Sequence, residues 1–597
     1  MEEVLPTGYE DSIPHYKEYK RKLALSPIAQ DLLRMRYLKR NQEGNIVEDP
    51  VGMFHRVAQN IALGDKKYGG NVKGAEQSFF AHLINQDFIP ASPILMNAGN
   101  TLQFLFSDHA LDVPDSVEEI FDVLKLGATI QQHGGGVGFS FSKIRPRKDS
   151  VSGMKNVAFG PMSVMKIFDT SFSAIIQGGR RSGANMAILH ITHPDIMSFI
   201  EAKSDLQALQ NFNLSVAVTD EFMQAVNEGK NFSLINPRND EVVRSVPAKL
   251  LFDAIVEQSW QTGDPGVIFI DEMNRKYPFK NKDVLCTGSC GQYELESFEG
   301  VPYAHINLLK ILIEKNGVFA IDEQTLRHLI RDVVHFLDNC VDMHAYTNAI
   351  IEEKTKASRK IGLGVLGFAD MLFKMGVSYG SDDSVVVIRK LMAIIQDESR
   401  NASHALALQR GPFSDFKNSV FKKQMRHAGV TSIAPTGSTS ILAHSSQSIE
   451  PVYAFSYTTK TSEGEQFTIL NEAFKDAIDA LPVDRTAKIQ LQFVDSVKNI
   501  SWLDDDFKTI YRTAMDISPG EHLKVMATFQ EYVDNSISKT INLPNKATRE
   551  DVADIIQQAH ALHCKGITLY RDGCREDQAL AVKRQTRLSA FEDSENN

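Results

Sequence analysis

The sequence predicts an α/β fold, either a barrel or a layered domain, that follows an N-terminal helical region. Between residues 27 and 82 apolar side chains recur near helical spacing, in the stretches PIAQDLLRMRYL, MFHRVAQNIAL and AEQSFFAHLI. From about residue 90, short apolar runs alternate with helical patterns. The runs include MAILHI, LSVAVT and GVIFID, and the helical patterns include VEEIFDVLKLGATIQQ and TLRHLIRDVVHFLDNCV. Such alternation over several hundred residues is typical of an α/β barrel or a layered α/β domain.

The composition excludes several classes of protein. The chain has 597 residues, 43% hydrophobic and 23% charged, which suits several domains or one large barrel. A net charge of −11 gives no general attraction to DNA, RNA or an anionic membrane. The acidic N-terminus is not a signal peptide and no run is long enough to span a membrane. Five cysteines, an odd count, argue against a disulfide framework, so we expect a cytoplasmic protein.

Four glycine-rich loops allow close backbone approach to a ligand, although a tight strand–helix turn is the more common explanation of each. They are HGGGVG (133–138), QGGRRSGAN (177–185), GLGVLG (362–367) and APTGSTS (434–440). The hydroxyls and N–H groups of PTGSTS suit a phosphate, and the arginines of QGGRRSGAN could add bidentate contacts. GLGVLG resembles a dinucleotide fingerprint only superficially, because no acidic residue is clearly placed about twenty positions later.

Two of the cysteines lie in VLCTGSCGQ (284–292). Structural zinc would need two further Cys or His ligands nearby, and only His305 follows, alone, so we expect no metal site. Two explanations stay open. Cys286 and Cys290 are either buried thiols beside a turn or include a reactive cysteine on a loop tip, where small neighbours let a substrate approach.

Further motifs follow one another along the chain from about residue 25 to 575. They are PASPILMNAG, QQHGGGVGFSFSKIRP, QGGRRSGANMAIL, NFNLSVAVTDEFM, GDPGVIFIDEMNR, RKIGLGVLGFADML, APTGSTSI, DNSISKTINLP and CKGITLYRDG. With these motifs, in this order, the chain resembles the class II, adenosylcobalamin-dependent ribonucleotide reductases.

The resemblance implies a ten-stranded α/β barrel of two half-barrels with a central finger loop. The expected domains are an N-terminal helical region (1–89), the barrel (90–575) and a flexible tail (576–597). Cys290 matches the loop-tip cysteine that becomes a thiyl radical and removes the ribose 3′ hydrogen. The tail LSAFEDSENN has no glycyl-radical motif, so the implied cofactor is adenosylcobalamin.

The resemblance also implies binding residues for a ribonucleotide. The substrate-binding set is Ser92, Gly288, Pro435, Thr436, Gly437, Ser438, Thr439 and Ser440. Arg180, Arg181 and Ser182 match the loop that links a nucleotide-effector site to the active site. Effector control stays open, because SGMKNVAFGP (152–161) carries Met154 and Lys155 where the family has small residues. Residues 117–126 match the helices through which family members often form homodimers.

The chain departs from the family at the expected catalytic positions. Aligned with a family segment LSACFVLPVEDS, the stretch LFSDHALDVPDS places Asp108 at the first redox cysteine. Aligned with PYESCNLGSINL, the stretch SFEGVPYAHINL places Val301 at the second. The family reads N-P-C-G-E around the radical cysteine, where this chain has Gly288 for the asparagine and Gln292 for the general-base glutamate. The C-terminal cysteine pair is also absent after Cys574.

These replacements give hypotheses for single residues. Asp108 could be a general acid or base near the ribose 2′ carbon, with a pKa raised by burial; the alternative is a surface carboxylate in a shifted loop. Gln292 can form hydrogen bonds but has no useful basicity. Cys286 is either a structural thiol or a displaced reductant. Cys340 is expected in the core, and Cys564 with Cys574 could form a replacement pair.

Three functions remain open from the sequence. The first is a cobalamin-dependent thiyl-radical enzyme that acts on a ribonucleotide with altered, redox-neutral chemistry such as isomerisation or elimination. The second is a ribonucleotide reductase with an external or relocated reductant. The third is a catalytically silent relative that binds a nucleotide or cobalamin.

Overall fold

The computed structural model describes residues 13–177, 181–182, 184–460 and 466–575. Arg180 and the tail expected at 576–597 therefore lie outside the described residues. Arg181 and Ser182 form the short strand β5 (Arg181–Ser182), of which only the backbone is described.

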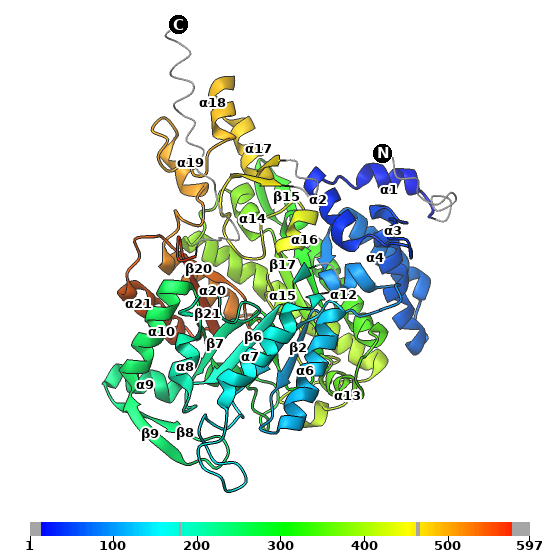
Figure 1. Ribbon diagram of the computed structural model, residues 1–597. Helices are drawn as coiled ribbons and strands as arrows, with labels where there is room; N and C mark the ends of the chain where they lie inside the picture. The colour runs from blue at the N-terminus through cyan, green and yellow to red at the C-terminus, as the bar shows by residue number, and fades with distance from the viewer. Residues whose placement is uncertain (1–12, 178–180, 183, 461–465, 576–597) are drawn as a thin grey trace.

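Helices form the N-terminal part of the chain and lie together on one side of the barrel (Figure 1). Their starts follow from capping: Ser26 and Asp49 accept hydrogen bonds from backbone N–H groups three residues on, and a proline follows each cap. The elements are α1 (Tyr16–Lys22), α2 (Pro27–Leu32), the π-helix η2 (Leu33–Tyr37), α3 (Pro50–Ala62), the 3₁₀ helix η3 (Leu63–Tyr68), α4 (Val72–Asn85) and α5 (Ser92–Asn97).

The first half-barrel consists of five parallel strands that pair in the order β2, β3, β6, β7 and β10. They are β2 (Asp108–Asp112), β3 (Gly136–Ser140), β6 (Asn185–His190), β7 (Asn213–Val218) and β10 (Gly266–Phe269). The strands predicted at 186–191 and 214–219 are thus confirmed. The run predicted at 266–271 is part strand and part helix, because α11 begins at Ile270.

The second half-barrel runs in the opposite direction and meets the first where β10 pairs antiparallel with β21. Its members are β21 (Gly566–Arg571), β20 (Thr540–Leu543), the segment 431–433, β17 (Gly362–Leu366) and β14 (Tyr303–Asn307). Parallel bridges from Ile433 to Ile537 and from Leu363 to Thr431 place the segment 431–433. The short strand β13 (Gly300–Val301) pairs with β2 and leads into β14, which closes the ten-stranded arrangement.

Helices cover the outside of this barrel (Figure 1). The predicted helix over 117–132 is α6, and the one predicted over 325–341 lies within α12. They are α6 (Val117–Gln132), α7 (Gly160–Ser173), α8 (Ile196–Ile200), α9 (Asp220–Glu228), α10 (Ala248–Thr262), α11 (Ile270–Lys276), α12 (Glu323–Met343), α13 (Ala349–Ser358), α14 (Phe368–Met375), α15 (Asp382–Arg410), α16 (Gly437–Leu442), α20 (Pro519–Gln530) and α21 (Arg549–Ala561).

Smaller elements complete the described chain. They are short helices and strands, and most of the strands form two-stranded hairpins. The helices are η4 (Glu201–Lys203), η5 (Leu308–Ile311), η6 (Phe416–Asn418), α17 (Glu472–Ala480), α18 (Arg485–Leu491) and α19 (Asp505–Ile510). The strands are β1 (Phe88–Pro90), β4 (Ile176–Gln177), β8 (Asn231–Ile235), β9 (Val242–Pro247), β11 (Cys286–Thr287), β12 (Glu294–Leu295), β15 (Leu312–Lys315), β16 (Val318–Ile321), β18 (Ser456–Lys460) and β19 (Gln466–Leu470).

Successive side chains of the barrel strands pack alternately into two hydrophobic clusters, one beneath the outer helices and one inside the barrel. On β6, Ala187 and Leu189 pack in the large core beneath the helices, whereas Met186 and Ile188 belong to a separate inner cluster. The same alternation puts Ala110 of β2 inside and its neighbour Leu111 outside. The inner cluster is small, so that polar side chains and the β11–β12 hairpin share the barrel interior.

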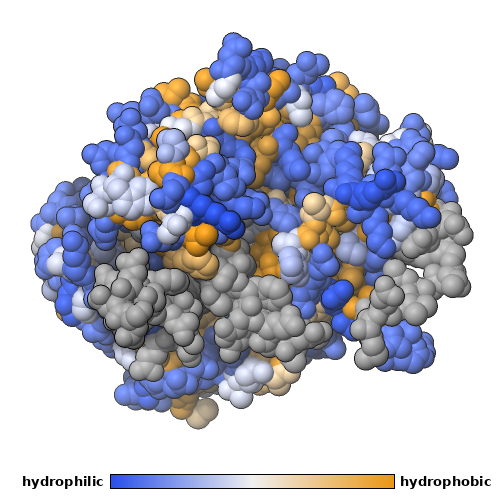
Figure 2. Space-filling model, turned by 90° about the horizontal axis from the view of Figure 1, so that it is seen from above, coloured by the Kyte–Doolittle hydropathy of each residue, from blue (hydrophilic) through white to orange (hydrophobic). Residues whose placement is uncertain are grey.

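The surface gives no sign of a membrane segment. Among the described residues, every helix is too short or too polar to cross a bilayer. Seen from above, hydrophobic residues reach the surface in patches between hydrophilic ones (Figure 2).

Candidate active site

The β11–β12 hairpin is the expected finger loop, and Cys290 lies at its turn. Gly288 N–H donates to the Tyr293 carbonyl at 2.9 Å, and Gly291, at φ +78°, donates to the Gly288 carbonyl at 3.1 Å. The hairpin touches the barrel wall so closely that a Cβ on Gly138 would lie 1.8 Å from the Thr287 carbonyl oxygen. The structure therefore confirms that this segment enters the barrel, with Cys290 at its tip.

Cys290 differs from the other cysteines in its exposure. It is partly exposed, whereas the other four are buried, and none of the five forms a disulfide. Burial raises the pKa of Cys286 and Cys340 well above the usual range, and raises that of Cys564 to about 12. Buried thiols of this kind are poor thiolates, so the structure gives no support to Cys286 as a displaced reductant.

Asp108 lies on β2, 2% exposed, and its carboxylate is bound to the finger loop. Its Oδ1 accepts hydrogen bonds from the Ser289 backbone N–H at 2.8 Å and from the Ser289 hydroxyl at 2.5 Å. Its Oδ2 accepts a hydrogen bond from the Gln292 amide. The alternative of a surface carboxylate in a shifted loop is therefore wrong: Asp108 is inside the barrel, next to the loop that carries Cys290.

Gly288 leaves the space that Asp108 fills. A Cβ added to Gly288 would lie 2.8 Å from Cγ of Asp108 and 2.9 Å from its Cβ. Contacts this short are not tolerated, so a side chain at 288 and the observed position of Asp108 exclude each other. The replacements at 108, 288 and 292 thus form a single contact set rather than three separate losses.

The register of β13 and β2 puts the two positions that match the redox cysteines side by side. Val301 is the partner of Asp108 in the antiparallel ladder, and it belongs to the inner cluster. Directly opposite residues in such a ladder lie close enough for their side chains to touch. Here one position carries a carboxylate and the other an isopropyl group, so this pair cannot form a disulfide.

Two polar side chains on β14 were not expected at the site: Tyr303 was missed in the sequence, and His305 was considered only as a zinc ligand. Tyr303 belongs to the inner cluster, and His305, two residues along the strand, faces the same way. Each ring lies against a glycine of β17: Tyr303 is the register partner of Gly362, and His305 of Gly364. A Cβ on Gly362 would lie 2.0 Å from the Tyr303 ring. The segments YAH and GLG both have a period of two residues, so that each ring of one segment faces a glycine of the other. This match can be recognised only once the pairing of the two strands is known.

The GLGVLG segment therefore has a structural role that differs from a dinucleotide loop. Residues 362–366 form the buried strand β17, and its first two glycines leave room for the rings of β14. Burial, followed by the negative charge of Asp108, raises the pKa of Tyr303 well above its usual range. Tyr303 is thus coupled to the carboxylate that holds the finger loop.

The expected substrate loop begins α16, and its hydroxyls form hydrogen bonds both within the loop and with residues outside it. Thr436 Oγ1 accepts from the Ser448 N–H at 2.7 Å, and Thr439 and Ser440 donate to carbonyls three residues earlier. Pro435 and Gly437 are exposed, and Ser438 is partly exposed. Ser438 accepts a hydrogen bond from Arg36 at 3.1 Å.

The N-terminal helices contribute to this end of the site. Arg36 and Tyr37 are the neighbours in η2 that reach the barrel: Tyr37 and Ser92 share a hydroxyl–hydroxyl hydrogen bond of 2.8 Å. Arg36 is the cation beside the loop 435–440 that the sequence reading missed. The sequence could not show this contact, because positions about 400 residues apart leave no local pattern.

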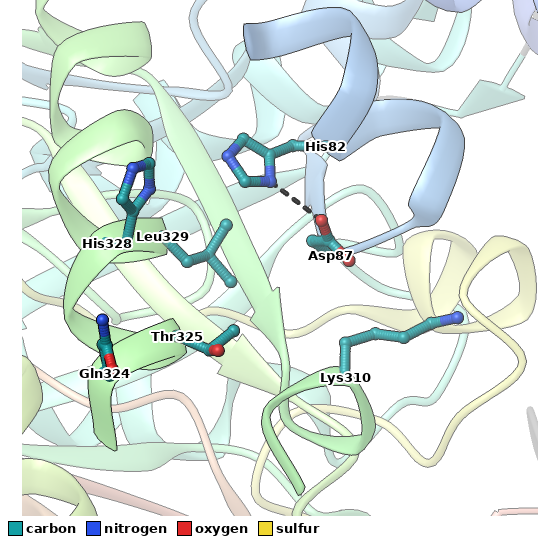
Figure 3. A pocket seen from close by; sticks show the side chains of 7 residues that line it. All are labelled: His82, Asp87, Lys310, Gln324, Thr325, His328 and Leu329. Carbon is teal, nitrogen blue, oxygen red and sulfur yellow. Dashed lines mark hydrogen bonds and ion pairs between the residues drawn. The ribbon is translucent and has the colours of Figure 1, made fainter. Parts of the chain in front are cut away.

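A surface pocket lies outside this site. It has a volume of about 240 Å³ and is lined by residues of α4, α12 and their neighbours (Figure 3). His82 there binds Asp87 at 2.8 Å and Asp332 at 2.9 Å, and His328 lies nearby. Both ring nitrogens of His82 are occupied by carboxylates, so these contacts form an ion-pair cluster between two helices. None of the lining residues belongs to the finger loop or to residues 434–440.

Two protein families match the chain, and together they cover most of it. Residues 23–103 match the family described as "Ribonucleotide reductase, all-alpha domain". Residues 107–428 and 419–570 match the one described as "Ribonucleotide reductase, barrel domain". The boundary between the two matches falls between the N-terminal helices and β2.

Individual proteins show the same similarity. A "Vitamin B12-dependent ribonucleoside-diphosphate reductase" of Thermoplasma acidophilum is 38% identical, over 94% of this chain and 81% of that protein. A protein of the same description from Mycobacterium tuberculosis is 36% identical, over 96% of this chain and 83% of its own length. Among solved structures, the "Actinobacillus ureae class Id ribonucleotide reductase alpha subunit" has a TM-score of 0.76 over 92% of this chain and 97% of its own. Its sequence identity of 21% limits that likeness to the fold.

Proposed function

Because the chain belongs to the ribonucleotide reductase family, we propose that it is an adenosylcobalamin-dependent radical enzyme that acts on the ribose of a ribonucleotide. Cys290 carries the thiyl radical and takes the hydrogen atom from C3′. The outcome is redox-neutral, such as an isomerisation or an elimination. The vitamin B12-dependent relatives, at 36–38% identity, support the cofactor and the substrate class.

One observation carries the altered outcome: the paired positions 108 and 301 hold no thiol. Reduction at C2′ needs two electrons, which in the family come from a pair of cysteines at these positions. Asp108 can accept or donate a proton there, but it supplies no electrons. The products must therefore contain the same number of electrons as the ribonucleotide, unless a reductant enters from outside.

The residues around the finger tip fit a cofactor of this type. Cys290 is the cysteine that is partly exposed, and the other cysteines of the described chain are buried. This exposure favours Cys290 as the thiol that a bound radical source reaches. When bound, adenosylcobalamin supplies a carbon-centred radical by homolysis of its cobalt–carbon bond. Cys290 receives the radical and returns a hydrogen atom at the end of the cycle.

Polar residues on the barrel strands and loops then handle the substrate. Asp108 and Gln292 face C2′ and C3′ as a proton-transfer group and a hydrogen-bonding amide. Gln292 Oε1 is buried and forms no hydrogen bond with a described residue, so it has an acceptor to offer to a ribose hydroxyl. Ser92, Thr436 and Ser438, together with Arg36, bind the phosphates at the other end of the site.

Spectroscopy with two cysteine variants tests this function. The protein is mixed anaerobically with adenosylcobalamin and each ribonucleotide, and cobalt–carbon homolysis is followed by absorbance while products are identified. Cys290→Ala should lose all product formation, because no other accessible thiol can hold the radical. Cys286→Ala is the matched control and should keep it. Product from Cys290→Ala would show that the radical role is assigned to the wrong residue.

The relatives' names favour a second candidate, a deoxynucleotide-forming reductase that uses an external reductant. It shares the radical step on Cys290 and differs in the product and in the need for electrons. A catalytically silent protein would show neither homolysis nor product with any nucleotide. The same mixtures therefore separate all three functions.

Assembly and regulation complete the proposal. We propose a cytoplasmic homodimer in which α6 lies at the interface, because Val117 and Phe121 expose 59% and 52% of their surface there. A nucleotide effector would bind near the loop of Arg180, Arg181 and Ser182. Light scattering of the purified protein, with and without nucleotides, checks the dimer: a monomer under all conditions contradicts it.

A further inference from the structure

Two buried histidines of the barrel wall have ring nitrogens without hydrogen-bond partners among the described residues. His109 and His305 are 1% and 2% exposed, and no ring nitrogen of either forms a hydrogen bond of ordinary geometry there, although each ring has one backbone contact, to Gly136 and to Ile89 respectively. Burying such nitrogens without partners is costly, because their hydrogen bonds to water are lost. Each therefore needs a physical explanation.

His109 is explained by its packing on the outer face of the barrel wall. It follows Asp108 on β2, so its side chain points away from the interior. Its ring stacks on Phe104 with centroids 5.4 Å apart, and Phe106 and His344 lie close by. His109 is thus one ring of an aromatic cluster, and no ligand is needed to account for it.

His305 lies on the opposite, inner face, where its neighbours do not explain it. Its ring lies beside that of Tyr303, 6.5 Å between centroids and 18° between planes. On the next strand Gly364, its register partner, leaves the space that the ring occupies. Burial lowers the pKa of His305 to about 4, and a hydrogen-bonding contact with the backbone of Ile89 raises it only in part. At neutral pH the ring is uncharged and carries one N–H donor and one acceptor.

The position of β14 connects the catalytic loop to the substrate loop. Tyr303 precedes His305 and is coupled to Asp108, which holds the finger loop. On the other side β1 pairs with β14, with Ile89 opposite His305, and leads to Ser92 two residues beyond Pro90. In the family segment PYESCNLGSINL, aligned above, leucine and serine stand where this chain has Tyr303 and His305. Polar rings have therefore replaced smaller side chains between the two ends of the site.

We propose that His305 binds the ribose hydroxyls of the substrate directly through its unpaired ring nitrogens. Tyr303 is a positioning residue: it holds the imidazole between its own ring and Gly364 and connects it to Asp108. The inference rests on the proposed function in taking the occupant to be a ribonucleotide. In this role His305 determines specificity for the ribose and compensates for the asparagine that the family has at the position of Gly288.

Calorimetric titration of the full-length protein with ribonucleoside diphosphates and their 2′-deoxy counterparts tests the proposal without any cobalamin. His305→Phe keeps the ring and removes both nitrogens, and His109→Phe is the matched control on the outer face. In His305→Phe the hydrogen bonds to the ribose hydroxyls are lost, so ribonucleotide binding should weaken about tenfold or more. The ratio between the affinities for the ribonucleotide and the deoxynucleotide should fall as well. His109→Phe should change neither affinity, and His305→Gln should restore part of the loss.

Thermal unfolding of the same variants distinguishes a ligand-binding histidine from one that only stabilises the fold. Without nucleotide, His305→Phe should unfold at a higher temperature than the parent protein, because two unpaired buried nitrogens are removed. If His305→Phe binds ribonucleotides as the parent does, His305 does not contact the substrate. If it weakens ribonucleotides and deoxynucleotides equally, the ribose is the wrong part of the ligand.

The titrations also separate this inference from the proposed function. A parent protein that binds ribonucleotides through His305 but shows no cobalt–carbon homolysis refutes the radical chemistry alone. A parent protein that binds ribonucleotides and is indifferent to His305→Phe refutes the ribose contact alone. If the parent protein binds no ribonucleotide, both are wrong.

Discussion

Three replacements at the catalytic positions are coupled through one carboxylate. Asp108 accepts hydrogen bonds from Ser289 and Gln292 and occupies the space beside Gly288. A glutamate at 292 would put a second negative charge against Asp108, and a side chain at 288 would collide with it. Once a carboxylate stands at 108, glycine at 288 and an amide at 292 follow from sterics and charge.

Restoring the family's glutamate at position 292 tests this coupling. Gln292→Glu should destabilise the protein at pH 7 by about 1–3 kcal/mol, because two buried carboxylates cannot both stay ionised in contact. The loss should shrink toward pH 5, where the pair can hold a shared proton. Thermal unfolding at the two pH values measures it.

A second substitution shows whether Asp108 is the cause. In the double variant Asp108→Asn with Gln292→Glu, the charge repulsion is removed, so most of the stability at pH 7 should return. The matched control is Asp112→Asn, on the same strand but paired with Lys143 at 2.6 Å. If Gln292→Glu unfolds at the parent's temperature at pH 7, the two side chains are not in contact.

The sequence points to these three positions but does not show their contacts. Ungapped alignment located Asp108, Gly288 and Gln292, and the hairpin geometry followed from the resemblance. The space left by Gly288 for Asp108 joins positions 180 residues apart, and no local pattern reports it. For the same reason the rings of Tyr303 and His305 were not expected at the site, since every residue of β14 is buried and the side facing the interior is hidden in the sequence.

At the scale of elements, local sequence patterns predicted which helices and strands exist better than they predicted where each one begins and ends. The amphipathic stretch 117–132 is α6 over its whole length. The apolar run 266–271 instead changes from strand to helix at Ile270, where Asp271 and Glu272 begin the first helical turn. Apolar periodicity cannot show such a junction, because buried strand and buried helix residues look alike over six positions.

An ion pair between His82 and Asp332 joins α4 to α12, and its strength depends on pH. Figure 3 shows the second carboxylate partner of His82, Asp87. Burial lowers the pKa of His82, but hydrogen bonds to Asp332 and Asp87 raise it further, to about 9. The folded-state pKa is therefore above the unfolded value of about 6.5. The stabilisation is complete below about pH 6.5 and is lost as the pH rises through 9.

Replacement of this histidine should consequently matter most in acid. His82→Gln is expected to lower the free energy of unfolding by about 1–3 kcal/mol at pH 6 and by much less at pH 9.5. Denaturant unfolding at both values measures the difference. His404→Gln, whose ring bonds a backbone carbonyl, is the control and should show no such trend. An equal loss at both pH values would mean that His82 is not held as a cation.

At the scale of the whole molecule, the barrel keeps a cysteine at the tip of the finger loop and changes the residues around it. Alternation of short strands and helices predicted an α/β class, and the ordered motifs identified the ten-stranded form. The N-terminal helices are more than a separate cap, because Arg36 reaches the expected substrate loop at Ser438 and Tyr37 reaches Ser92. The contact of Arg36 with Ser438 could not be predicted, since it joins the first and last thirds of the chain.

Product analysis with and without a reductant tests the central claim most directly. The protein is incubated anaerobically with adenosylcobalamin and each ribonucleotide, either with dithiothreitol or without it, and the nucleotides are identified by mass spectrometry. We expect a product other than a deoxynucleotide, formed equally well without dithiothreitol. The reason is that positions 108 and 301 carry no thiols and therefore supply no electrons for a reduction. A deoxynucleotide that appears only when dithiothreitol is present would contradict this claim.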